Sequence, residues 1–85
     1  MRKAIKGGNY VAMANLGLMY FNGEGVPQSY VHSYAWYSTA AAAGDYHSKG
    51  EKDIVKNRMT REQIAKGQEL AAEYWEKYVV PFQKN

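Results

Sequence analysis

The sequence predicts an all-α fold in which antiparallel helix pairs stack as a short α-solenoid closed by a C-terminal capping helix. One observation is an internal repeat with a period of 36 residues, since Gly8-Asn9-Tyr10-Val11-Ala12 aligns with Gly44-Asp45-Tyr46-His47-Ser48. A fixed period of this size is typical of helix-pair solenoids. The other is the recurrence of apolar residues at helical spacing between glycine- and proline-containing breaks. At 85 residues the chain is one domain with one modest core.

The first helix is expected over about residues 9–22, with Asn9 as its N-cap. Its inward face is expected to hold Ala12, Leu16 and Tyr20, flanked by Met13 and Gly17. A glycine inside a helix costs about 1 kcal/mol relative to alanine. Gly17 therefore indicates that another helix passes too close for a side chain.

The second helix is expected from Ser29 or Tyr30 to Ala43, after a glycine-rich turn that ends in Pro27. A third, more charged helix follows over about residues 46–58. The last helix opens with Thr60 and Gln63, a capping-box pair, and its inward face has Ile64, Gly67, Ala71, Tyr74 and Tyr78. Pro81 is expected to stop it.

These helices predict a single repeat domain over residues 1–85. Within it we expect the end of a preceding unit (1–7), a complete repeat (8–43), a degenerate first helix (44–58) and a capping helix (60–80).

Charge is distributed unevenly along the chain. No Lys or Arg occurs between Gly7 and Ser48, and this span holds six of the eight tyrosines. Such a segment is covered either by a partner or by its own packing, and we favour its own packing because aromatic residues at helical spacing usually belong to the core.

The linked motifs of the first two helices resemble those of Sel1-like repeats, which are similar to tetratricopeptide repeats. Leu16-Gly17 and Tyr20 precede the turn Gly23-Glu24-Gly25-Val26, and Tyr34-Ala35-Trp36-Tyr37 precedes the alanines that end at Gly44. Residues 59–75 resemble the closing helix of bacterial members. Ser33 stands where these repeats often carry alanine, and Lys52-Asp53 replaces the second Leu-Gly.

The resemblance implies a protein–protein interaction module, or adaptor, with a concave binding face. On the first helix, a stripe spaced by four, three and four residues is left over from the inward face, and the 36-residue period transfers it to the third helix. We therefore expect a groove for a partner peptide or helix, lined by Val11, Asn15, Leu18, Asn22, His47, Glu51, Ile54 and Arg58. The alternative is that this stripe is simply solvated, or is packed against the next repeat unit.

The sequence favours a protein that is not an enzyme. It lacks cysteine and has two histidines that lie on different expected helices. His47 and Glu51 are one helical turn apart, but two ligands fall short of the three or four of a usual metal site. Gly23-Glu24-Gly25 lacks the preceding strand and the third glycine of a dinucleotide site. No catalytic residue, cofactor or metal is therefore expected.

Two further partner classes were weighed. A homodimer is the main alternative, through an apolar repeat edge expected around Ile5, Tyr10 and Met13. Nucleic-acid binding by the basic segment 49–66 is disfavoured because Glu51, Asp53 and Glu62 are interleaved with its cations. No membrane segment is expected. The lack of cysteine and of a convincing signal peptide favours the cytoplasm, and a periplasmic fragment is the alternative.

Overall fold

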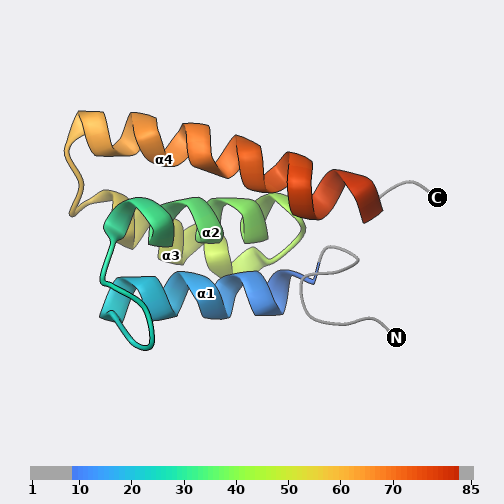
Figure 1. Cartoon of the computed structure of the whole chain (residues 1–85), viewed down its shortest axis with the longest axis horizontal. Helices are drawn as coiled ribbons and strands as arrows, with labels where there is room; N and C mark the ends of the chain where they lie inside the picture. The colour runs from blue at the N-terminus through green and yellow to red at the C-terminus, as the bar shows by residue number, and fades with distance from the viewer. Residues whose placement is uncertain (1–8, 83–85) are drawn as a thin grey trace.

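The computed structural model describes residues 9–82 and confirms the predicted fold of stacked antiparallel helix pairs. Its α-helices are α1 (Tyr10–Asn22), α2 (Tyr30–Ala42), α3 (Tyr46–Lys56) and α4 (Arg61–Tyr74). Each of α1, α2 and α3 runs antiparallel to the next, and α4 runs in the direction of α2 (Figure 1). The expected segment 1–7 and Ile5 lie outside the described residues, and the division of the chain into repeat units stays a prediction.

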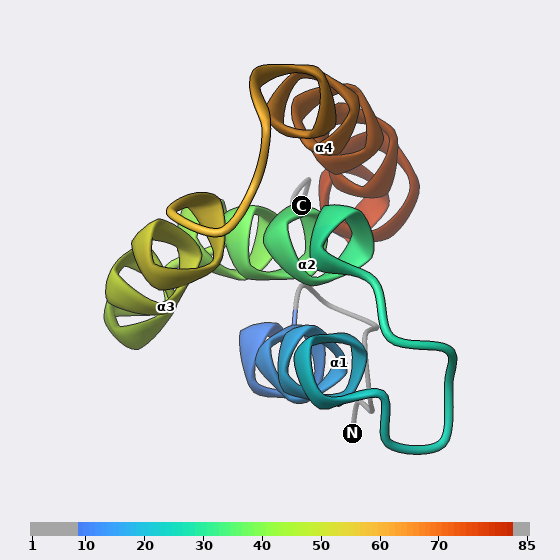
Figure 2. The same ribbon diagram turned by 90° about the vertical axis from the view of Figure 1, so that its left-hand side faces the viewer.

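Helix α2 is the centre of the molecule, because α1, α3 and α4 all pack on it (Figure 2). It contains no Lys, Arg, Asp or Glu, as expected for a helix with little solvent-facing surface. More than half of its 13 residues are buried: Ser33, Tyr34, Ala35, Trp36, Tyr37, Thr39 and Ala40. The tyrosine-rich half of the chain is thus largely covered by its own packing, although Tyr46 remains 86% exposed.

Side chains cap the N-termini of the helices at Asn9, Ser29, Asp45 and Thr60. The predicted capping box of α4 is confirmed. The Gln63 backbone N–H donates to Thr60 Oγ1 at 3.1 Å, and the Thr60 N–H donates to Gln63 Oε1 at 2.9 Å. Each cap satisfies amides that have no partner within the helix, which sets where the helix begins.

The buried face of α1 is rotated relative to the sequence prediction. Met13 and Gly17 are its buried residues, whereas Ala12, Leu16 and Tyr20 are only half-buried. The reason is that α1 packs mainly on α2, along a line on which Met13 joins the core cluster of Trp36, Ala40 and Val79. The expectation that Met13 contributes to an exposed dimer edge is therefore wrong, since its exposed fraction is 0%.

Two glycines allow the neighbouring helices to approach tyrosine rings of α2. A Cβ atom on Gly17 would lie 3.0 Å from the Tyr37 ring, and one on Gly67 would lie 2.5 Å from Tyr34 Cδ2. Contacts below 3.0 Å require a neighbour to move. The prediction that Gly17 marks a close helix approach is confirmed, and Gly67 has the same role on the opposite side of α2.

The C-terminal end of α4 continues beyond its last α-helical turn. A π-helical turn spans Trp75–Val79 and a 3₁₀ turn spans Val80–Phe82. Pro81 therefore lies within the helical path and does not end it, because its fixed φ is compatible with a 3₁₀ turn. Val79 is 2% exposed and joins the core of Met13 and Trp36. None of the described helices is long and apolar enough to cross a membrane.

Candidate partner-binding groove

Helices α1 and α3 lie next to each other on α2 but make few contacts with one another. In Figure 2, α1 and α4 lie on opposite sides of α2, and α3 lies beside α2 toward α1. The seam between α1 and α3 holds a pocket of about 120 Å³. We call this pocket the α1–α3 groove, and its described lining residues are Leu18, Phe21, Asn22, Tyr37, Glu51, Ile54 and Val55.

The groove has exposed apolar walls and a buried floor. Leu18 on α1 is 48% exposed, and Ile54 on α3 is 50% exposed. Beneath them Val55 is 1% exposed and Tyr37 is 5% exposed, in the same core cluster. At about 120 Å³ the pocket is smaller than the roughly 300–1,000 Å³ typical of small-molecule sites. Its size suits one apolar side chain of a larger partner.

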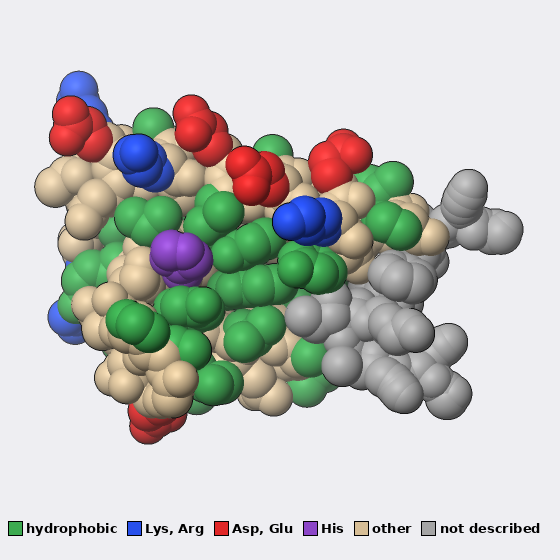
Figure 3. Space-filling view, in the orientation of Figure 1, with side chains coloured by type: hydrophobic (Ala, Val, Ile, Leu, Met, Phe, Trp, Pro, Cys, Tyr) green, Lys and Arg blue, Asp and Glu red, His purple; other side chains and the backbone are tan. Residues whose placement is uncertain are grey.

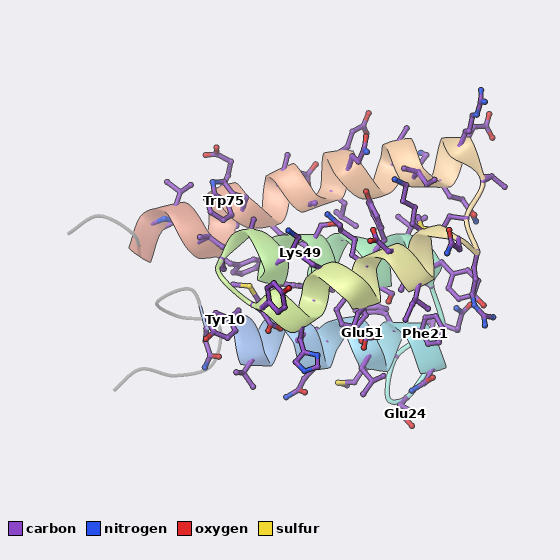
Figure 4. The ribbon with its side chains drawn as sticks, turned by 180° about the vertical axis from the view of Figure 1, so that it is seen from behind. Tyr10, Phe21, Glu24, Lys49, Glu51 and Trp75 are labelled. Atoms are coloured by element: carbon purple, nitrogen blue, oxygen red, sulfur yellow. The ribbon has the colours of Figure 1, made fainter. Side chains whose placement is uncertain are left out.

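Four of the eight predicted site residues line this groove together, namely Leu18, Asn22, Glu51 and Ile54. Arg58 lies at its edge, where its Cζ is 5.6 Å from the centroid of the Phe21 ring. Figure 4 shows Glu51 and Phe21 in the seam between α3 and α1. The 36-residue period thus places the two halves of the predicted stripe on facing helices.

The other three predicted residues do not line the groove. Val11 and Asn15 are exposed on α1, outside the pocket. His47 lies in a different and more open depression of about 400 Å³, which is also lined by Tyr46, Lys49 and Gly50. The predicted residues therefore line a pocket only toward the C-terminal ends of α1 and α3.

Three lining residues were missed by the sequence prediction. Phe21 is three residues after Leu18, so the same helical spacing identifies it as part of the wall. Val55 is four residues after Glu51, so helical spacing also places it on the same face of α3 as Glu51. Tyr37 comes from α2 and forms the floor. The sequence prediction considered only the first helix of each pair, so it could not include Tyr37, which belongs to the second.

The groove contains one charged and one phenolic side chain. Burial raises the pKa of Tyr37 to about 12, and the negative charge of Glu51 adds to this increase. Tyr37 therefore remains a neutral phenol at physiological pH. Glu51 is half-buried. Among the described residues there is no cluster of three or more His, Cys, Asp and Glu side chains that could hold a metal ion.

The opposite face of the molecule has an apolar surface across its middle, with charged side chains along the α4 edge (Figure 3). Trp36 stacks on Tyr74 with ring centroids 3.9 Å apart, and Tyr20 stacks on His32 at 5.0 Å. A shallow depression on the α2–α4 side is lined by Val31, His32, Lys66, Glu69, Leu70 and Glu73.

Comparison with known proteins gives a family match, mainly in the first half of the chain. The family model described as Sel1 repeat matches residues 11–45, which run from α1 through α2 to the start of α3. A search of the curated proteins and a search of the solved structures each gave no significant match. Sel1 repeats are generally protein-interaction modules and typically act as non-catalytic scaffolds.

Proposed function

We propose that this chain, a Sel1-like repeat protein by its match over residues 11–45, is an adaptor that holds a segment of a partner protein in the α1–α3 groove. The observation that carries the proposal is the combination of Leu18 and Ile54 around one pocket. Each exposes about half of its surface, at 48% and 50%, although the floor beneath them is closed. An apolar anchor of the partner would cover both side chains at once.

Energetic considerations support this use of the groove. Removing apolar surface from water stabilises a contact by roughly 25 cal/mol per Å². Interfaces usually depend on a few central anchors that are seated in preformed pockets, each worth more than about 1 kcal/mol. Val55 and Tyr37 are held by the core, so the pocket is preformed and little ordering cost opposes binding.

The test is a selection of displayed peptides against the wild-type chain, followed by affinity measurements with the enriched peptides by fluorescence anisotropy. Leu18→Ala and Ile54→Ala remove the two walls and are expected to weaken binding roughly five- to thirtyfold, since a change of 1–2 kcal/mol corresponds to this range. Leu70→Ala is the matched control, because Leu70 lines the depression on the opposite face. Enriched peptides that bind Leu18→Ala and wild type equally well would rule out the groove.

Self-association is the rival function. The exposure of two tyrosines outside the groove, Tyr46 at 86% and Tyr10 at 40%, favours it. Light scattering over a concentration series separates the two. The adaptor proposal predicts a monomer at the concentrations used for peptide binding. A dimer that dissociates in Leu18→Ala would mean that a second copy occupies the groove.

A further inference from the structure

Glu51 is the charged residue among the described side chains that line the α1–α3 groove. Two of the three helices around it provide no counter-ion, because neither α1 nor α2 contains any Lys, Arg, Asp or Glu. Within α3, the residues one turn from Glu51 are His47 and Ser48 on one side and Ile54 and Val55 on the other. The carboxylate thus faces an apolar, uncharged wall.

Within the part of the chain that the structure describes, no hydrogen bond or ion pair engages this carboxylate, and its oxygens remain accessible to water and so to a partner. It is half-buried beside Leu18, Ile54 and Tyr37, where water is partly excluded. Moving charge away from water is unfavourable unless a counter-ion or hydrogen-bond donor replaces the water. A cation brought by a partner would form a charge-assisted contact with Glu51, which is stronger than a neutral hydrogen bond. Glu51 also raises the pKa of Tyr37, so its charge acts within the groove.

Arg58 does not occupy this position. It lies in the turn after α3, two residues beyond Lys56, the last residue of the helix. Its Cζ lies 5.6 Å from the Phe21 ring centroid, at the edge of the groove. The groove therefore carries a negative charge at Glu51 and a positive charge at its Phe21 edge, and this polarity favours one direction of a charged segment.

We propose that the groove selects a peptide segment in which an apolar side chain is accompanied by a Lys or Arg. The apolar side chain lies between Leu18 and Ile54, and the cation pairs with Glu51. This inference rests on the proposed function, since it assigns a chemical class to the partner of the same groove. Ile54 and Glu51 are three residues apart, about 4.5 Å along α3. A helical partner would therefore carry the cation three or four positions from its apolar anchor.

The test uses a displayed library of peptides with one fixed leucine and randomised flanking positions. It is selected separately against wild type, Glu51→Gln, Glu51→Lys and Leu18→Ala. Wild type is expected to enrich Lys or Arg near the leucine, and Glu51→Lys is expected to enrich Asp or Glu instead. A synthetic copy of the best wild-type peptide should bind Glu51→Gln about tenfold more weakly than wild type, as the loss of one charge-assisted contact implies.

Glu69→Gln is the matched control, because Glu69 lines the depression on the opposite face, and its affinity for the same peptide should equal that of wild type. One outcome is that the selected peptides show no enrichment of Lys or Arg and still bind Leu18→Ala more weakly than wild type. This result would overturn the charge inference and leave the proposed function standing. No enrichment on wild type over Leu18→Ala would contradict the proposed function, and the inference with it.

Discussion

The packing of α4 on α2 depends on the lack of a side chain at Gly67. A Cβ atom there would lie 2.5 Å from Tyr34 Cδ2, about 0.9 Å short of an ordinary van der Waals contact of 3.4 Å. Tyr34 has little room to retreat, because it is 5% exposed and packs in a cluster with Tyr37 and Val55. Gly67→Ala is therefore expected to push α4 away from α2.

The expected magnitude follows from two opposing effects. Overpacking of a well-ordered core costs about 1–3 kcal/mol. The higher helix propensity of alanine returns about 1 kcal/mol. Because Tyr34 is buried and the contact is as short as 2.5 Å, the cost is expected in the upper part of that range, about 2–3 kcal/mol. The net loss in the free energy of unfolding is then about 1–2 kcal/mol.

Gly50→Ala is the matched control for this substitution. Gly50 also lies inside a helix, but a Cβ atom there meets nothing within 4 Å. This variant is expected to gain about 0.5–1 kcal/mol from propensity alone. Urea denaturation followed by circular dichroism at 222 nm measures both variants. Near-ultraviolet circular dichroism reports on the Trp36–Tyr74 stack, whose centroids are 3.9 Å apart across the α2–α4 interface.

The two variants should thus shift stability in opposite directions and differ by about 1.5–3 kcal/mol. The double variant Tyr34→Leu/Gly67→Ala should lose less than the sum of the two single losses, because the two sites are in direct contact. If Gly67→Ala were as stable as Gly50→Ala, with its aromatic signal unchanged, the close contact between α4 and α2 would be refuted.

Three further changes are expected to alter stability. Ser33→Ala removes a buried 2.8 Å hydrogen bond from Ser33 Oγ to the Gly17 carbonyl and should cost about 1 kcal/mol in urea denaturation; unchanged stability would contradict this. Thr60→Ala removes the cap of α4 and should cost about 1 kcal/mol, a fall of roughly 4–8 °C in Tm; an unchanged Tm would show that the capping box is dispensable. Burial raises the pKa of Tyr37 and Tyr74 from 10.0 to about 12. The folded state therefore binds these protons more tightly than the unfolded state, and stability should fall as pH rises from 10 to 12. Tyr37→Phe should reduce that fall, and an equal fall in this variant would contradict the assignment.

The fold could be predicted from the sequence because its local signals agree with one another. Asn9, Ser29 and the Thr60–Gln63 pair are side chains that favour helix starts in any context, and each begins a helix in the structure. The glycines between helices likewise mark stops that depend only on local backbone geometry. These features need no knowledge of which helix packs on which.

Features that depend on tertiary packing were harder to predict. The buried face of α1 is centred on Met13 and Gly17 because α2 is its main packing partner, and periodicity alone does not distinguish this face from one shifted by a residue. Pro81 lies inside a 3₁₀ turn that follows a π-helical turn, and such local changes of helix type have no simple sequence pattern.

Part of the groove could be predicted from local sequence patterns. The 36-residue period and helical spacing place Leu18 and Ile54 on neighbouring helices, and the structure brings them around one pocket. The floor residue Tyr37 belongs to the second helix of the pair, so it requires knowledge of how deeply α2 lies between α1 and α3. The position of His47 in a separate depression depends on where the two helices diverge, which spacing does not reveal.

The central claim is that a partner segment lies between α1 and α3, and backbone-amide chemical-shift mapping tests it most directly. The ¹⁵N-labelled chain would be titrated with a peptide selected on wild type. We predict that the largest shifts lie at Leu18, Phe21, Ile54 and Val55, with little change at Val31 and Leu70 on the opposite face. Largest shifts around Val31 and Leu70, with the groove amides unmoved, would contradict the account.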